Sequence, residues 1–153
     1  MRSQENFASA FERAFAHLQI AIEEAWASEV EWPAQVAAAI RASFDFAAAD
    51  PVSANVLTNE ALAQGADGIA RHRRLVAYAA NLLKSGRAER LEGSELPEVL
   101  ERALAGGIAF LVGQRLDQGR AADLPAVAPE AIEVVLAPYI GAHEARRVAE
   151  SHR

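Results

Sequence analysis

Residues 4–28, QENFASAFERAFAHLQIAIEEAWAS, decide the fold, because they predict an amphipathic helix at the start of the chain. Apolar side chains recur there every three or four positions, as in the buried stripe of a helix. The stripe consists of Phe7, Phe11, Ala14, Leu18, Ile22 and Ala25. Phe15, Ile20 and Trp26 lie off this stripe. Apolar side chains on more than one side predict a central helix, which its neighbours surround over much of its circumference.

The rest of the chain is divided by Gly, Pro and Asp into further helical segments, and none alternates apolar and polar residues as a strand would. Pro33 suits the first turn of a second helix, and Asp50 with Pro51 marks the start of a short third one. The sequence predicts an all-α, single-domain helical bundle over residues 1–153. We expect about six main helices and a short C-terminal tail that is prone to fray.

The later helices have predicted ends at particular residues. The fourth helix is expected to begin near Asp67 and to end after Lys84, where Gly86 would form a left-handed cap. The fifth is expected to cover residues 96–119. Pro138 is expected to end the sixth, because proline does not continue a helix.

Three glycines inside the fifth helix are unusual. Each of Gly106, Gly107 and Gly113 costs about 1 kcal/mol of helix stability relative to alanine, so a packing gain must offset the loss. Ala103, Gly106 and Gly113 lie near one face, where small residues let another helix approach closely. That helix belongs either to the same chain or to a second subunit, and the sequence favours the subunit, since this helix also has a leucine face.

Composition narrows the function. The chain has 153 residues, no cysteine and a formal net charge of -6. Disulfides and thiolate metal sites are therefore excluded. Binding to nucleic acid by this chain is not expected, because such proteins need a surplus of Lys and Arg. The densest basic run, residues 70–75, is expected to be a solvated helix start. Without a membrane-length apolar segment or a secretion leader, we expect a cytoplasmic protein.

Four stretches carry a distinctive order of helix starts and breaks. They are EWPAQVAAAIRASFDFAAADP (31–51), NEALAQGADGIARHRR (59–74), LPEVLERALAGGIAFLVGQRLDQG (96–119) and LAPYIGAHEA (136–145). Together they resemble the C-terminal domain of TetR/AcrR-family transcriptional regulators over nearly the whole chain. The resemblance implies a helical domain that binds a small-molecule effector and forms a homodimer through a four-helix interface.

The resemblance also implies which helices form that interface. They would be residues 96–119 and 127–136, each meeting its counterpart in the partner subunit. Candidate interface residues are Leu100, Ala103, Gly106, Gly107, Phe110, Gly113, Ile132, Val135 and Leu136.

The start of the chain resembles a particular helix of these regulators. RSQENFASAFERAF, residues 2–15, is similar to the helix that follows their three-helix DNA-binding head. We expect that head, and with it direct DNA binding, to be absent from this chain. A fragment of a longer regulator and a natural headless protein are both compatible with this expectation.

Effector contacts are predicted from the side chains themselves, since a small-molecule site is mostly apolar with a few polar groups. Candidate ligand-binding residues are Phe15, Phe44, Asn55, Asn59, Glu60, Tyr78, Phe110 and Gln114. Core packing of the aromatic rings, and hydrogen bonding of the amides to a loop or to water, are the alternatives. Arg115 is expected either to pair with an acidic ligand or to form a salt bridge at the rim.

No catalytic pattern is present. The four histidines are scattered, and the sequence contains no zinc-binding His-Glu-x-x-His, no Gly-x-Ser-x-Gly and no phosphate-binding glycine loop. We therefore expect no enzymatic activity, no cofactor and no metal site.

Three functions follow as hypotheses. The first is an effector sensor, in which ligand would shift residues 4–28 and so change the spacing of two DNA-reading heads in a full-length relative. The second is an interaction module that pairs with a full-length regulator and leaves the heterodimer with one head. The third is a stand-alone binder of lipophilic molecules.

Overall fold

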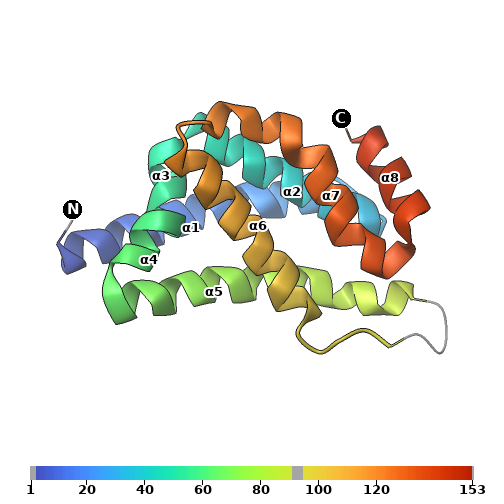
Figure 1. Cartoon of the computed structure of the whole chain (residues 1–153), viewed down its shortest axis with the longest axis horizontal. Coiled ribbons are helices and arrows are strands. Elements are labelled where there is room, and N and C mark those ends of the chain that lie inside the picture. Colours follow the sequence, from blue (N-terminus) through green and yellow to red (C-terminus); the bar gives the residue numbers. More distant parts are fainter. Residues whose placement is uncertain (1–2, 91–94, 153) are drawn as a thin grey trace.

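The computed structural model describes residues 3–90 and 95–152, and every regular element within them is helical (Figure 1). The predicted all-α single domain is confirmed. The elements are α1 (Gln4–Ala27), α2 (Trp32–Ala49), α3 (Pro51–Asn55), the π-helix η1 (Val56–Glu60), α4 (Ala61–Ala63), α5 (Gly65–Lys84), the 3-10 helix η2 (Ser85–Glu89), α6 (Leu100–Asp117), the 3-10 helix η3 (Ala121–Asp123), α7 (Leu124–Ile140) and α8 (Ala142–Ser151). α3, η1 and α4 follow one another without a break and count as one helix. The described residues then contain six main helices followed by α8, as predicted.

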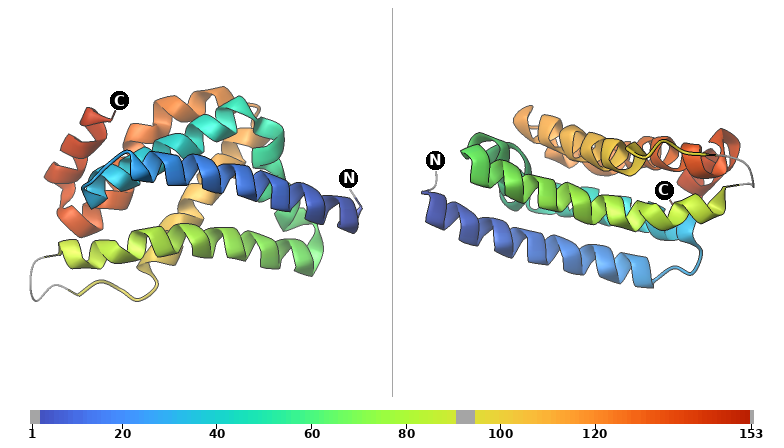
Figure 2. Two further views of the ribbon diagram at one scale, coloured as in Figure 1. Left: turned by 180° about the vertical axis from the view of Figure 1, so that it is seen from behind. Right: turned by 90° about the horizontal axis from the view of Figure 1, so that it is seen from below.

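The helices form layers in the right-hand view of Figure 2. There α1 lies at one outer side, α5 and α2 lie in the middle, and α6 and α7 lie at the other outer side. α2 packs against both α1 and α7. Its Ala37, Ala39 and Ala47 are buried, and these small side chains let helices approach from several directions. α2 is therefore the central helix. The prediction that residues 4–28 occupy this position is wrong, since Ile20 and most charged residues of α1 are exposed.

The predicted helix starts are set by local hydrogen bonds. Ser3 Oγ accepts a hydrogen bond from the backbone N–H of Asn6 (3.2 Å) at the start of α1. Asp50 Oδ1 accepts one from the backbone N–H of Ser53 (3.1 Å), and Pro51 occupies the first turn of α3. Each carboxylate or hydroxyl satisfies an N–H that has no partner inside its helix. The predicted start of the third helix is confirmed.

The fifth predicted helix begins later than expected. α6 starts at Leu100, because an arginine holds the preceding backbone in a non-helical course. Arg87 donates from Nη1 to the carbonyl of Leu96 (3.1 Å) and from Nη2 to that of Pro97 (2.6 Å). Contacts from a side chain nine and ten positions earlier therefore override the local start signal.

Two features near the C-terminus also differ from expectation. Pro138 lies inside α7, which continues to Ile140 and ends where Gly141 adopts a φ of 85°. Proline is tolerated there because it removes only the donor to the carbonyl of Val134, which lies on the solvent side of the helix. The residues expected to fray form α8, which packs on α7 and buries Val148.

Gly86 does not form the left-handed cap that its position suggests. Among the described residues, only Gly65, Gly119 and Gly141 have a positive φ. Gly86 instead lies in η2, where an added Cβ would be 2.2 Å from the ring of Trp32. Glycine is required there by the close approach of an indole ring.

Replacing Gly86 with alanine is therefore expected to lower the free energy of unfolding by about 2 kcal/mol, through overpacking. The Trp32 ring is buried and its Nε1 donates to the carbonyl of Leu82 (3.2 Å), so moving it aside also weakens that bond. Urea denaturation measures the loss. The exposed change Ala88→Ser in the same short helix is the control, expected within about 0.5 kcal/mol of the parent. A Gly86→Ala variant as stable as the parent would contradict this account.

A buried carboxylate joins α6 to α7 and to η2. Glu101 is 4% exposed, and its Oε1 accepts a hydrogen bond from Arg87 Nη2 (2.8 Å). Its Oε2 accepts one from the hydroxyl of Tyr139 (2.6 Å), whose ring meets Trp32 edge-on at 5.1 Å between centroids. Burial works to raise the pKa of Glu101, but the hydrogen bonds from Tyr139 and Arg87 and the charge of Arg87 outweigh it, so the pKa is lowered. Burial and the contact with Glu101 raise the pKa of Tyr139.

Candidate functional site

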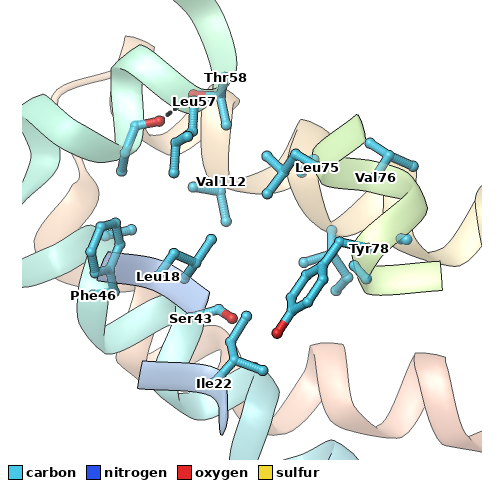
Figure 3. A pocket seen from close by; sticks show the side chains of 16 residues that line it. Leu18, Ile22, Ser43, Phe46, Leu57, Thr58, Leu75, Val76, Tyr78 and Val112 are labelled. Carbon is cyan, nitrogen blue, oxygen red and sulfur yellow. Dashed lines mark hydrogen bonds between the residues drawn. The ribbon is translucent and has the colours of Figure 1, made fainter. Parts of the chain in front are cut away.

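An apolar pocket of about 90 Å³ lies between the helices (Figure 3). It is bounded by α1, α2, α3 with η1, α5 and α6, so residues from most of the length of the chain contribute to it. The side chains that define its walls include Leu18, Ile22, Ser43, Phe46, Leu57, Thr58, Leu75, Tyr78, Ala105 and Val112. Such a lining favours apolar molecules over water.

Three hydroxyl groups are the polar side-chain atoms of this lining. Ser43 Oγ donates to the carbonyl of Ala39 and Thr58 Oγ1 to that of Ala54, each at 2.8 Å. The Tyr78 hydroxyl has no hydrogen-bond partner among the described residues. Burial and the nearby charge of Glu23 raise its pKa, so it stays protonated at neutral pH and keeps its donor.

A second pocket of about 70 Å³ adjoins the first. The two share lining residues from four helices, namely Ile22, Ser43, Ala79, Ala105 and Ile108. The second pocket extends towards Trp26, Leu82 and Val135. The pockets therefore form two lobes of one apolar region.

A row of contacting aromatic rings connects Tyr78, in the pocket wall, to α1. The ring of Tyr78 meets that of Phe15 edge-on, with 5.7 Å between centroids, and Phe15 meets Phe11 at 5.9 Å. The guanidinium of Arg74 lies 5.2 Å from the centre of the Phe15 ring, and its Nη2 contacts both carboxylate oxygens of Glu12 at 2.7 Å. A displacement of Tyr78 would therefore be transmitted to α1 through direct contacts.

In the basic run of residues 70–75, Arg71 and Arg74 form ion pairs and also remain partly exposed to solvent. Arg71 contacts Glu12 at 2.6 Å and Asp67 at 3.0 Å. The pairs of Arg71 and Arg74 with Glu12 attach the first half of α5 to α1, which the sequence did not indicate, whereas the pair with Asp67 lies within α5.

Of the predicted ligand-binding residues, Tyr78 lines the apolar pocket, and Phe15 packs against the ring of Tyr78. Phe44 is fully buried in the core around α2 and α7. Asn55 and Glu60 line a separate surface depression of about 270 Å³. The structure thus separates residues that the sequence grouped into one site.

The remaining candidates lie at a surface groove of about 450 Å³ beside α6, which Asn59, Phe110 and Gln114 all help to line. Asn59 Nδ2 donates to Asn55 Oδ1 (3.0 Å) and to the carbonyl of Gly113 (2.9 Å). The amides therefore bind each other and a backbone carbonyl of helix α6, a partner that differs from both the shared ligand site and the loop or water of the alternative.

Sequence reasoning missed the pocket hydroxyls of Ser43 and Thr58. A signal for Ser43 was present, because it interrupts the apolar stripe of α2 between Ile40 and Ala47. Thr58 gave no such signal, since it lies in the π-helical segment, where side-chain directions depart from the usual helical spacing.

The three glycines of α6 differ in their surroundings. Gly113 packs within the chain, since an added Cβ would be 2.9 Å from Asn59 Oδ1. At Gly106 and Gly107 an added Cβ would meet nothing within 4 Å. Packing within the chain therefore explains Gly113, whereas no described residue would contact a Cβ added at Gly106 or Gly107.

The predicted interface on α7 requires a correction. Ile132, Val135 and Leu136 are buried in the core of this chain, so their side chains do not reach a partner surface. The exposed apolar residue of this helix is Val134, at 64%. The sequence correctly predicted that these three side chains point into the core, and this orientation excludes them from a dimer interface.

The outer face of α6 keeps its apolar candidates exposed. Phe110 is 71% exposed, Ala103 is also exposed and Leu100 is half-buried. A groove of about 360 Å³ runs beside Ala103 and Gly107 and is bounded on its other side by Val134. Arg115 lines the same groove. We call Ala103, Gly106, Gly107, Phe110 and Val134 the outer face.

Within residues 3–90 and 95–152, no three His, Asp or Glu side chains lie close enough together to hold a metal ion. No helix in them is long and apolar enough to cross a membrane.

No protein-family profile, no curated protein and no solved structure matches this chain.

Proposed function

We propose that this chain is the ligand-sensing and dimerisation domain of a TetR/AcrR-like transcriptional regulator, and that it binds a small apolar or amphipathic effector. The observation that carries the proposal is the apolar pocket, because one of its lining residues also contacts α1. Tyr78 faces the pocket and touches Phe15. The sequence resemblance over residues 31–145 supports the same function.

Signal transfer follows from this contact. A ligand in the pocket competes with Tyr78 for space, and the favoured position of that ring differs between the empty and the filled state. Because Phe15 packs on Tyr78, the position of α1 changes with it. Ligand shifts the equilibrium only by its difference in affinity for the two positions. In a full-length regulator, α1 would pass this movement to the DNA-binding head.

The outer face supports dimerisation. Exposed large apolar side chains commonly mark a protein interface. Phe110 lines the groove on one side of α6, and Val134 bounds the groove on the other side, beside the small residues Ala103 and Gly107. In a two-fold symmetric dimer the same patch is used by both subunits. Phe110 of one subunit would then fill a groove of the other.

The outer face equally suits pairing with a full-length regulator, the second function. The two cases differ in outcome. A homodimer forms in the pure protein, whereas a heterodimer forms only when the regulator is added, and it weakens operator binding because one head is lost. A stand-alone lipophilic binder would bind ligand and exchange no subunits.

The sensor function predicts a response of α1 to an apolar probe. Saturation with benzene is expected to change hydrogen exchange of the α1 amides around Phe15 at least about threefold, while those of α8 stay constant, because α8 lines neither pocket lobe. Ala79→Phe, which places a ring in both lobes, should abolish binding and the response. Binding of benzene with unchanged exchange in α1 would contradict the sensor mechanism.

A further inference from the structure

The two pocket lobes meet where the polar atoms lie. Ile22 and Ser43 line both lobes, and Figure 3 shows the hydroxyl end of Tyr78 pointing towards them. Away from this junction, one lobe is lined by side chains such as Leu75 and Val112 and the other by Leu83 and Trp26. The region is thus apolar at its two ends, with hydroxyl groups near its middle.

The two junction hydroxyls differ in what they offer a ligand. Ser43 Oγ donates its hydrogen bond to the carbonyl of Ala39, so towards a ligand it can act only as an acceptor. The Tyr78 hydroxyl keeps its proton for a ligand, since no described residue accepts it. Tyr78 is half-buried, and its hydroxyl can donate a hydrogen bond to a ligand acceptor at the junction of the lobes.

Charge selects the ligand further. No Asp, Glu, Lys, Arg or His side chain lines either lobe. An ionised group brought into this region would lose its hydration without gaining a counter-ion. The ligand is therefore uncharged.

Size sets the third condition. The lobes measure about 90 and 70 Å³. An engineered protein cavity of about 150 Å³ with a similar aliphatic lining binds benzene. A ligand of this region therefore has few heavy atoms, divided between the two lobes.

We propose that the joined lobes bind a small neutral molecule with one hydrogen-bond acceptor between two apolar arms, and that this acceptor receives a hydrogen bond from the Tyr78 hydroxyl. This inference rests on the proposed sensor function and specifies the ligand class of its pocket. It distinguishes a central carbonyl or ether oxygen from one at the end of a chain.

Isomeric ketones test the position of the acceptor. Binding of 4-heptanone, 2-heptanone and heptanoate to the full chain is measured by calorimetry. We expect 4-heptanone to bind about three- to tenfold more tightly than 2-heptanone, the gain that one net hydrogen bond gives. Heptanoate is expected not to bind measurably.

Tyr78→Phe removes the donor and keeps the ring. It is expected to remove the preference for 4-heptanone over 2-heptanone, because neither ketone then receives a hydrogen bond at this position. Thr58→Val is the matched control: it removes a hydroxyl that lines only the first lobe, and the preference for 4-heptanone should persist.

The outcomes separate this inference from the proposed function. Equal affinities for the two ketones, or a preference that survives Tyr78→Phe, overturn the ligand class while benzene binding still upholds the pocket. Binding of heptanoate as tightly as the ketones overturns the exclusion of charge. Failure of benzene and both ketones to bind overturns the pocket, and with it both proposals.

Discussion

Gly106→Leu is expected to raise the dissociation constant of the homodimer at least about 100-fold and to leave the fold of the subunit intact. Within the subunit, an added Cβ at Gly106 meets nothing within 4 Å, so the larger side chain fits without strain. Leucine is also the better helix former by about 0.8 kcal/mol, and the isolated subunit should therefore become more stable. In the proposed dimer, the same side chain would occupy space that the partner helix needs. Sedimentation over a range of concentrations measures the loss.

The control for this variant is Ala70→Leu, which adds a leucine to an exposed position of α5, away from the outer face. It should leave the dissociation constant unchanged. Phe110→Asp tests the same face with a different change and should also yield monomers, because it buries an unpaired charge. Dimers that persist in both Gly106→Leu and Phe110→Asp would place the interface elsewhere.

Glu101→Gln is expected to lower the free energy of unfolding by about 2 to 3 kcal/mol at pH 7. The change removes the charge that Arg87 pairs with, inside a site where the carboxylate side chain is only 6% exposed. Removing one partner of a buried ion pair is costly because the other charge stays poorly hydrated, and the partial exposure of Arg87 limits the loss. Chemical denaturation of both proteins gives the difference.

The pH dependence has a definite sign. The pKa of Glu101 is lower in the folded chain than its ordinary value, so its ion pair stabilises the fold at pH values above the unfolded-state pKa of about 4.3. This contribution is lost as the pH falls through the lower, folded-state pKa. The stability difference between parent and Glu101→Gln should therefore shrink below pH 4.

The surface pair of Glu133 and Arg146 provides the comparison, because Arg146 is well exposed there. Glu133→Gln is expected to change stability by less than about 1 kcal/mol. An equal effect of Glu101→Gln and Glu133→Gln would show that burial adds nothing to the Glu101 pair.

The features of the fold that could be predicted correctly depend on residues that lie close together in the sequence. Asp50 and Pro51 start α3 through contacts within one turn, and the spacing of Phe7 and Phe11 identifies the buried stripe of α1. The errors depend on distant contacts. Gly86 is fixed by Trp32, more than fifty positions away, and no local pattern reveals an indole ring at that site.

The candidate site divides in the same way. Tyr78 could be predicted because an aromatic residue with a polar end stands out on a half-buried helix. The grouping of Asn59 and Phe110 with it could not be corrected from sequence, because only the packing of α6 against η1 assigns them to a groove on the surface instead of the pocket. The central position of α2 could not be predicted either, because several of its buried residues are alanines, which contribute little to a recognisable apolar pattern.

Native mass spectrometry of the freshly purified chain tests the central claim most directly, because it reports subunit number and any retained small molecule together. The sensor and dimerisation account predicts a dimer whose subunits carry the added mass of a small neutral molecule. A monomer without added mass, at micromolar concentrations where a stable homodimer persists, would contradict it.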